Sequence, residues 1–399
     1  MPLKPILSMA ALARVPGAEF PELIAKMLSL PGNADLFMSQ SHLFSVVGNQ
    51  NFALEMQARA LEISSVYRLE GTDKPAIRLL ALMGAGEQSV NTPLDYLVED
   101  SDIQVELLYI RPGQPLPDCI PEHDVAIVAL GESDQSRPAL EMMDRLTEHW
   151  PRPVLNLAKN ILCNSRDAIY QQLKDIPGLL IPPTLRISRQ DLVSVSRQEL
   201  PTEQLFGGTY PVTVRPLVSQ GGKGLARIAN APELATYLDA SDDEEFFVSF
   251  YIDYRSKDGL YRKARIALID GMPHICHLAI SSHWIVHYGS AGMTDSAAKR
   301  EEEARFMREF DTVFGKRHHQ ALRSIAEKLA LDYVVIDCAE TTNGDLLVFE
   351  ADNRGWVHAT DPIDLFPYKQ APMKKAFAAF RAMLFSAMNA PGNTERTEQ

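Results

Sequence analysis

The chain has 399 residues, 46% of them hydrophobic and 23% charged, and its formal net charge at pH 7 is −13. This length exceeds a single compact core and predicts two or three domains, while the acidic balance argues against a general nucleic-acid binder, whose surface must be basic. No apolar run is long enough to span a membrane, and the four cysteines are scattered without a CxxC pair, so we expect a cytoplasmic protein with reduced thiols.

The N-terminal region, residues 1–74, is predicted to be helical. Apolar residues recur every three to four positions over residues 34–66, with a break at Gly48 and Asn49, and this spacing predicts two amphipathic helices. The second helix, "GNQNFALEMQARALEI", looks like half of a tetratricopeptide repeat, but no second copy follows at a fixed period. We therefore expect one helical hairpin packed on the main body. The alternative is that this hairpin forms the contact between two subunits of a homodimer.

Residues 75–160 alternate short apolar strands with helical or irregular stretches, which predicts a small, Rossmann-like parallel α/β domain. The first strand is followed by "GAGEQS", which contains Gly84 and Gly86. A dinucleotide fingerprint requires a third glycine where Ser89 stands, so a tight turn is a better interpretation than a nicotinamide site.

Residues 161–390 form a second region in which strands come in runs. The dipeptides Asp270-Gly271 and Asn343-Gly344 are strong hairpin signals, so we expect a largely antiparallel α+β region. Helices are predicted at residues 166–174, 231–239, 297–311 and 316–330. The polar tail, residues 391–399, is predicted to be disordered.

A glycine-rich loop, "VSQGGKGLA" (residues 218–226), holds Lys223 among Gly221, Gly222 and Gly224. It is not a P-loop, because a glycine follows the lysine, but its backbone N–H groups and the lysine could still hold an anion. The strand before it, "PVTVRP", carries Arg215, and the two together predict a triphosphate clamp. A mobile hairpin loop with a surface arginine is the alternative.

The stretch "YVVIDCAETTNGDLLVFEADN" reads as a hairpin whose strands end in carboxylates. Counting outward from its turn places Asp337 opposite Glu350, with Asp352 on the same face. Mutual repulsion would be severe unless divalent cations lay among them, and these oxygen ligands suit Mg²⁺ with phosphate as a co-ligand. The alternative is a solvated hairpin edge, which the apolar runs of the two strands disfavour.

The strand cation, the lysine–glycine loop and the carboxylate hairpin, in this order, resemble the ATP-grasp superfamily over residues 75–385. The resemblance implies an ATP-grasp domain after the small parallel domain, with ATP and Mg²⁺ (or Mn²⁺) as cofactors. Arg215 stands where the family usually has a phosphate-binding lysine. In "FFVSFYI", similar to the family's adenine-binding hinge strand, Ser249 and Phe250 replace the usual Gln-Glu pair. The implied ATP contacts are Arg166, Arg215, Lys223, Ser249 and Tyr251.

The same resemblance implies the catalytic and metal-binding residues. "RKARIALIDG" resembles the family's strand with a phosphate-facing arginine, which is Arg265 here, and Arg265 would act together with Lys223. Asp352 stands where the family usually has asparagine, and Asn353 takes that role if the register shifts by one. The implied metal ligands are Asp337, Glu350 and Asp352.

The stretch "CHLAISSHWIVHYGSAGM" (residues 276–293) fits no general pattern. A zinc-protease HExxH motif would need glutamate where Trp284 stands, so zinc is not expected. His283 and His287, four residues apart, would share a face in a helix or a strand. Together with His277 they indicate either an acceptor-substrate pocket or structural packing. The stretch resembles one in bacterial ATP-grasp proteins that have repeat-like helices before the ATP-grasp domain.

The resemblance implies an ATP-dependent ligase that joins a small carboxylate to an amine through an acyl phosphate and releases ADP and phosphate. The candidate substrate-binding residues are Arg262, Lys263, His283, His287 and Arg354. Two alternatives remain: an ATP-grasp kinase that stops at a phosphorylated product, and a regulatory ATP-binding module that docks a partner through the N-terminal hairpin. No nucleic acid or membrane is expected as a partner.

Overall fold

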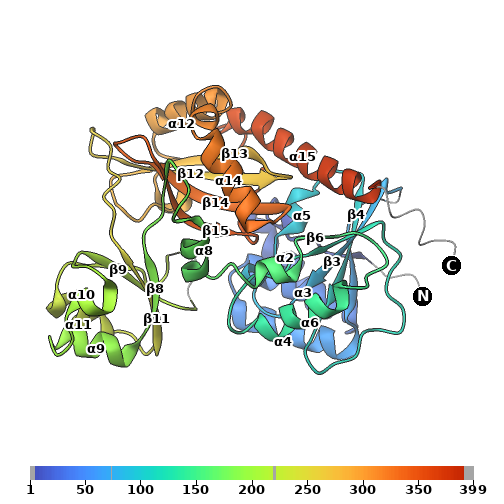
Figure 1. Cartoon of the computed structure of the whole chain (residues 1–399). Helices are drawn as coiled ribbons and strands as arrows, with labels where there is room; N and C mark the ends of the chain where they lie inside the picture. Colours follow the sequence, from blue (N-terminus) through green and yellow to red (C-terminus); the bar gives the residue numbers. More distant parts are fainter. Residues whose placement is uncertain (1–4, 73, 219–221, 391–399) are drawn as a thin grey trace.

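The computed structural model describes residues 5–72, 74–218 and 222–390, and the predicted tail at residues 391–399 lies outside this part of the chain. The described residues form three sheets (Figure 1). The first belongs to residues 5–163, here called the first domain. The second belongs to residues 184–250, the small lobe. The third belongs to residues 164–183 and 251–390, the large lobe.

The sheet of the first domain has the strand order β1-β2-β4-β3-β5-β6. Its central strands are parallel, as predicted, but β2 runs antiparallel to β4 and brings β1 with it. The predicted boundary at residue 74 therefore does not separate two domains, because β1 and β2 precede it and pair into the same sheet. The strands are β1 (Pro5–Ile6), β2 (Val66–Leu69), β3 (Ile77–Met83), β4 (Ile103–Tyr109), β5 (Val125–Val128) and β6 (Val154–Leu155).

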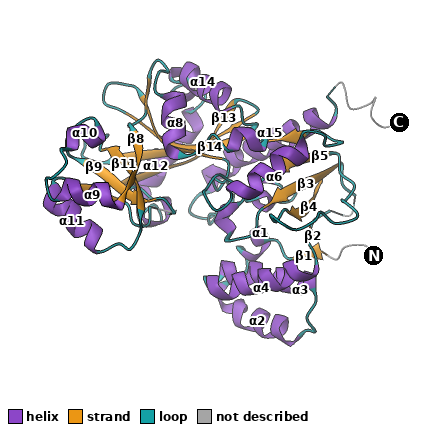
Figure 2. Ribbon diagram, turned by 60° about the horizontal axis from the view of Figure 1, so that its bottom comes forward, coloured by secondary structure: helices purple, strands orange, loops and turns teal. Residues whose placement is uncertain are grey.

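The N-terminal helical hairpin consists of α3 (Ala34–Val46) and α4 (Gln50–Ile63), which lie side by side below the sheet in Figure 2. The predicted break is present: Gly48 has a φ of +82°, which favours glycine, and the Asn49 side chain caps α4 by accepting a hydrogen bond from the backbone of Phe52. In the described residues α4 leads directly into β2, so a tetratricopeptide-type repeat is not confirmed.

The remaining helices of the first domain are short or lie at its periphery. They are α1 (Met9–Leu12), η1 (Gly17–Glu19), α2 (Phe20–Ser29), η2 (Gln88–Val90), α5 (Leu94–Leu97), α6 (Arg137–Thr147) and α7 (Ala158–Ile161). The glycine turn at Gly84 and Gly86 leads into η2, a single 3-10 turn, and the backbone of Gly84 bonds the Asn91 side chain. The long helix of a dinucleotide-binding turn is therefore missing after β3, in agreement with a tight turn.

The small lobe is an antiparallel sheet of order β10-β9-β11-β8. Val212, Val214, Phe246 and Val248 point to one face, where they form a core with the helices, and Arg215 lies on the other face. The elements are α9 (Arg189–Ser196), α10 (Thr202–Phe206), α11 (Ala231–Asp239), β8 (Thr184–Ser188), β9 (Val212–Pro216), β10 (Ala226–Ile228) and β11 (Glu245–Phe250). The sequence did not predict β8 and β10, which are short and lack clear turn signals.

The large lobe has the strand order β13-β12-β14-β15-β7, and all of its pairs except β15–β7 are antiparallel. Both predicted hairpins are confirmed. Asp270-Gly271 forms a two-residue turn with positive φ at both positions, and a longer turn around Gly344 joins β14 to β15. The elements are β7 (Leu179–Leu180), β12 (Tyr261–Ile269), β13 (Met272–Ser281), β14 (Tyr333–Glu340), β15 (Leu346–Asp352), α8 (Arg166–Leu173), η3 (Tyr288–Ser290), α12 (Ala297–Glu309), α13 (Phe314–Arg317), α14 (His319–Leu329), η4 (Pro367–Lys369) and α15 (Gln370–Met388).

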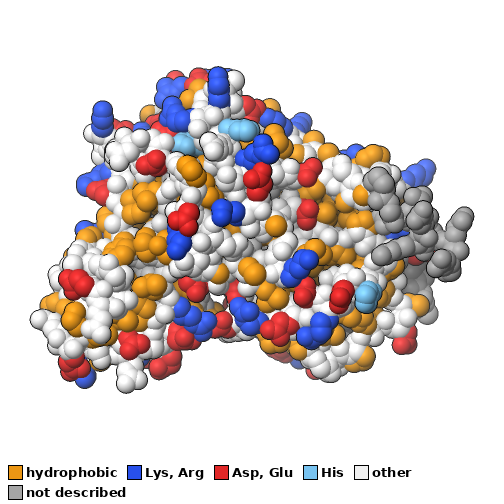
Figure 3. All heavy atoms as spheres, in the orientation of Figure 1, with side chains coloured by type: hydrophobic (Ala, Val, Ile, Leu, Met, Phe, Trp, Pro, Cys, Tyr) orange, Lys and Arg blue, Asp and Glu red, His pale blue; other side chains and the backbone are white. Residues whose placement is uncertain are grey.

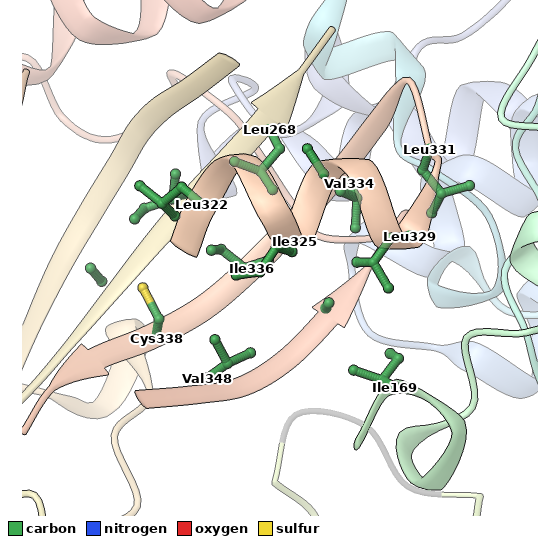
Figure 4. Packing of buried hydrophobic residues seen from close by; sticks show 14 of the residues in the cluster. Ile169, Leu268, Leu322, Ile325, Leu329, Leu331, Val334, Ile336, Cys338 and Val348 are labelled. Carbon is green, nitrogen blue, oxygen red and sulfur yellow. The ribbon is translucent and has the colours of Figure 1, made fainter. Parts of the chain in front are cut away.

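The two faces of the large sheet pack against different partners. On one face, α14 presents Leu322, Ile325 and Leu329 to Val334 and Ile336 of β14 (Figure 4). On the other face, one half is apolar and shares a core with α15 and with the first sheet. The polar half of that second face carries most of the predicted site residues, so the large sheet serves as the floor of the candidate site.

No helix in the described part of the chain combines the length and the apolar composition needed to cross a bilayer. The four cysteines are unbonded: Cys119 and Cys163 are exposed, and Cys276 and Cys338 are buried.

Candidate nucleotide and metal site

A row of four polar side chains crosses the large sheet. His277 on β13 is opposite Arg265 on β12, Arg265 is opposite Asp337 on β14, and Asp337 is opposite Glu350 on β15. The predicted pairing of Asp337 with Glu350 is therefore confirmed. A bulge next to Asp337 leaves Phe349 as an extra residue on β15, where the register shifts by one residue before it continues to the pair of Val335 and Asp352.

Asp337 is neutralised by the protein itself. Its side chain is 6% exposed, and its carboxylate accepts hydrogen bonds from Lys263 Nζ at 2.8 Å and Arg265 Nε at 2.8 Å. Burial alone would raise the pKa of this carboxyl, but Arg265 and Lys263 outweigh that effect and hold the pKa well below its ordinary value. Asp337 is thus a permanently ionised anchor for the two cations.

Glu350 lies in a more open and more positive environment. Its side chain is 38% exposed, and it accepts a hydrogen bond from Arg166, the first residue of α8. Arg215 approaches from the small lobe: burial and the neighbouring Arg166 lower the pKa of Arg215 to about 10, and Glu350 opposes this shift. Arg166 therefore pairs with Glu350 directly, and Arg215 is near enough to feel the charge of both.

Asp352 is held by its own loop. Its carboxylate accepts hydrogen bonds from the backbone N–H of Arg354 at 2.8 Å and from the Arg354 guanidinium at 2.6–3.0 Å. The stem of Arg354 lies against Gly131 of the first domain, where a Cβ would come within 2.1 Å of it. Arg354, predicted to bind substrate, is thus engaged with Asp352 and packed against the first domain.

Asn353, the alternative metal ligand, belongs to the structural interior. It is 3% exposed, and its amide donates to the carbonyl of Leu130, while its own carbonyl accepts from the Thr92 hydroxyl. These bonds join the end of β15 to the first domain and direct the side chain away from the carboxylate row, which leaves Asp352 as the residue next to Glu350 on the site face.

Repulsion among the three carboxylates does not require a metal ion, contrary to the expectation from the sequence. Each carboxylate already has a cation of its own, and the described residues contain no group of three or more His, Cys, Asp and Glu side chains that could hold a metal ion. The carboxylates still fit a Mg²⁺ site in which phosphate and water supply most of the ligands and the protein supplies only one or two carboxylates.

The glycine-rich loop lies against the histidine stretch. Gly222 and Gly224 have φ values of +72° and +71°, and a Cβ on Gly222 would lie 3.0 Å from His287 Nε2. Lys223 is exposed between them. The part of the loop at residues 219–221, including Gly221, lies outside the described residues. The described end of the loop thus lies close to His287, at the boundary between the two lobes, and leads from there into β10.

The predicted hinge strand connects the two lobes. Ser249 bonds the Thr184 hydroxyl at 2.7 Å, and the backbone N–H of Tyr251 donates to the carbonyl of Pro211. The Tyr251 ring packs edge-on against Trp284, with ring centroids 5.5 Å apart, and under the guanidinium of Arg227 at 4.7 Å. Sequence reasoning missed Arg227, although its alternation on β10 places it on the same face as Arg215.

The histidine stretch does not form a single face. His277 belongs to β13, whereas the residues from His283 to His287 are irregular, with His283 exposed. His277 packs against Tyr288 at a centroid distance of 4.5 Å, and burial together with Arg265 lowers the pKa of His277 far enough to keep it neutral. The structure therefore brings His277 and His287 to the site but leaves His283 on the surface.

Arg262 is the one predicted site residue that points the other way. Strand alternation puts Lys263 and Arg265 on the site face and Arg262 on the opposite face, where it pairs with Glu302 and Asp258. The structure therefore does not bring Arg262, a candidate substrate-binding residue, to the carboxylate row.

The outline of the molecule is indented between the small lobe and the first domain, with acidic and basic side chains along both sides (Figure 3). At this boundary Arg186 of β8 pairs with Asp134 of the first domain and with Glu245 of β11. All three parts of the molecule thus come together around the carboxylate row.

Comparison with known proteins gives solved structures only. No family model matches the chain, and no curated protein matches it. The VanG D-Ala:D-Ser ligase of Enterococcus faecalis is similar at 12% identity and a TM-score of 0.48, over 78% of this chain and 99% of that one. A RimK domain ATP-grasp protein of Sphaerobacter thermophilus has 15% identity and a TM-score of 0.42, over 76% and 98%. The D-alanine–D-alanine ligase of Coxiella burnetii has 13% and 0.47, over 81% and 97%.

The strand orders of the three sheets define the fold class, an α/β domain followed by an α+β region. An antiparallel small lobe and a larger antiparallel lobe follow a mostly parallel α/β domain, with the carboxylate hairpin on the floor between them. This arrangement is the one expected from the sequence, a small parallel α/β domain followed by a largely antiparallel α+β region.

Proposed function

We propose that the chain is an ATP-dependent ligase that joins a small carboxylate to an amine. The observation that carries the proposal is the excess of positive charge around the carboxylate row. Five basic side chains surround three carboxylates, which leaves a formal charge of +2: Arg166, Arg215, Lys263, Arg265 and Arg354 against Asp337, Glu350 and Asp352. Such an excess in a partly buried site suits a polyphosphate, whose charge it would offset.

ATP would lie between the lobes. Arg215 and Arg166 would face its phosphates, with Lys223 closing from the glycine turn, and the hinge strand at Ser249 and Tyr251 would hold the adenine through its backbone and aromatic contacts. Displacement of Arg166 from Glu350 by phosphate would free the carboxylate. Because Glu350 is partly exposed, breaking this ion pair costs little free energy.

A magnesium ion would be held by Glu350 and Asp352, with Asp337 behind them as the anchor of Lys263 and Arg265. When bound, the ion would supply positive charge that offsets the negative charge of the phosphates.

The proposed reaction has two steps, phosphoryl transfer and then attack by the amine. A carboxylate oxygen attacks the γ-phosphorus, the bond to the β–γ bridging oxygen breaks, and ADP leaves. The amine nitrogen then attacks the acyl carbon, phosphate leaves, and the nitrogen loses a proton. Arg265 and Lys263 would stay paired with Asp337 and stabilise charge on the transferred group, while the glycine-rich loop excludes water that would hydrolyse the acyl phosphate.

The test is a screen of amino acids and short peptides for substrate-dependent ADP release, with products identified by mass. An amide product together with ADP and phosphate is expected. A phosphorylated product without an amide would make the protein a kinase, and Mg·ATP binding without turnover across the screen would make it a regulatory module; either outcome rejects the ligase.

The charge excess itself can be tested with Arg215→Met. Loss of this guanidinium removes one of the two cations beside Glu350, so the affinity for Mg·ATP should fall by about tenfold or more, as expected for a charge-assisted hydrogen bond. Isothermal titration measures the change. Arg197→Met, at an exposed arginine at the end of α9, is the control and should bind as the wild type does. Equal affinity of the two variants would remove Arg215 from the phosphate site.

A further inference from the structure

A second cavity lies in the large lobe, away from the carboxylate row. Its volume is about 440 Å³, within the size range of small-molecule sites. We call it the rear cavity. Its floor is apolar and is formed by Ala264, Leu278, Phe306 and Phe314, and its rim is charged.

The rear cavity is separated from the nucleotide site by the sheet itself. Ala264 alternates with Lys263 and Arg265 along β12, so the cavity opens on the opposite face of the strand. On this face α14 covers β14 tightly, as Figure 4 shows, and the cavity lies beyond it, where α12 and α13 meet the sheet. It is therefore a separate site and does not extend the nucleotide cleft.

The charges on the rim leave an unbalanced positive group. Among the lining residues, Arg262 is paired with Glu302 (and also with Asp258, which does not line the cavity), and Arg317 is paired with Glu340. Among the described residues, neither Arg305 nor Lys257 takes part in an ion pair, and only Glu309 remains on the rim to oppose them. A ligand that fills the apolar floor and carries one negative charge would match both features.

The cavity also contacts the connection between the lobes. Tyr254, Ser256 and Lys257 line it, and they belong to the segment that leads from the hinge strand to β12. The Tyr254 hydroxyl donates to the carbonyl of Trp284 at 2.7 Å, and Trp284 packs on Tyr251. An occupant would therefore bridge this connection and α12.

We propose that the rear cavity is a second binding site, for a small molecule with an apolar body and one carboxylate, and that its occupant ties residues 251–260 to α12. The site does not depend on the proposed ligase activity, because its binding and its effect on the connection are measured without nucleotide.

The first test is titration of the full chain with 4-phenylbutyrate, an apolar body with one carboxylate, and with 4-phenylbutyramide, which lacks the charge. Saturable 1:1 binding of the acid is expected, with the amide weaker by about fivefold or more. Arg305→Gln should weaken binding of the acid to a similar extent. Arg308→Gln, at an exposed arginine of α12 that does not line the cavity, is the matched control and should bind within about twofold of the wild type.

The second test is hydrogen exchange with and without 4-phenylbutyrate. Protection is expected in residues 251–260 and in α12. Absence of saturable binding, equal binding of the acid and the amide, equal effects of the two arginine variants, or protection confined to other segments would each overturn the proposal.

Discussion

Asp337 and Glu350 are paired neighbours on adjacent strands, yet their environments give them different roles. Asp337 is enclosed by Lys263 and Arg265, whereas Glu350 is open to solvent on one side and pairs with Arg166 on the other. A carboxylate that already has two buried partners is an anchor, and an exposed one with a single displaceable partner is available as a ligand. At the scale of residues, the proposed function therefore assigns the holding of cations to Asp337 and the binding of metal to Glu350.

The first prediction concerns Glu350→Gln. The amide keeps the shape of the side chain but binds Mg²⁺ poorly, so Mg²⁺-dependent turnover should be abolished. The ion pair with Arg166 is partly exposed to solvent, so the free energy of unfolding should change by less than about 1 kcal/mol. Steady-state kinetics and urea unfolding measure the two quantities. Glu340→Gln, at the other end of the hairpin, is the control and should keep its activity; wild-type turnover in Glu350→Gln would exclude Glu350 as a metal ligand.

A second prediction concerns pH and Asp337→Asn. The variant leaves Lys263 and Arg265 without their counter-charge, so the free energy of unfolding at neutral pH should fall by about 3–5 kcal/mol. Since the pKa of Asp337 is lowered in the folded state, its stabilisation is present above the unfolded value of about 3.9 and is lost as pH falls toward the folded-state pKa.

The difference between wild type and Asp337→Asn should therefore stay constant from about pH 8 to about pH 5 and shrink only below about pH 4. Urea unfolding at a series of pH values measures it. A difference that already shrinks between about pH 7 and about pH 5 would contradict the lowered pKa.

At the scale of elements, Glu303 of α12 connects four segments at the outer edge of the large sheet, beside β13. This fully buried carboxylate on α12 accepts from the backbone of Leu278 on β13 and from the hydroxyls of Tyr288 and Tyr368, and Lys369 lies 3.6 Å away. Glu303 lies in the stretch "KREEEARF", whose composition is that of a solvated helix face. The tertiary contacts alone distinguish Glu303 from its neighbours.

The third prediction compares Glu303→Gln with Glu301→Gln on the same helix. The first removes a buried charge from beside Lys369 and leaves part of the hydrogen-bond network unmatched, so we expect a loss of about 2–4 kcal/mol in the free energy of unfolding. The second changes an exposed carboxylate and should cost less than about 0.5 kcal/mol. Chemical denaturation measures both, and equal stabilities would show that the network is not structural.

At the scale of the whole molecule, α15 joins the first domain to the large lobe. Phe380 is fully buried and packs against Tyr333 at a centroid distance of 5.6 Å, in a core that also contains Leu79 and Ile127 of the first sheet. The small lobe has a core of its own. We therefore expect the first domain and the large lobe to unfold together as one unit.

The fourth prediction is that Phe380→Ala destabilises this unit by about 3–5 kcal/mol through the cavity it leaves. Calorimetry should show the transition of the first domain and the large lobe shifted as one. Phe385→Ala, at a 46% exposed position on the same helix, should have little effect. Separate shifts for the first domain and the large lobe would contradict a shared core.

The sequence by itself determined the local features: the hairpins at Asp270-Gly271 and Asn343-Gly344, the helical hairpin broken at Gly48, and the positions of Asp337 and Glu350 on adjacent strands, whose exact pairing the bulge at Phe349 sets. These follow from alternation and turn chemistry, which depend on residues close together in the chain. Only the tertiary structure decided which cation neutralises which carboxylate, and that β1 and β2 join the first sheet. Such contacts join residues far apart in the chain, and a side chain's type does not specify its distant partner.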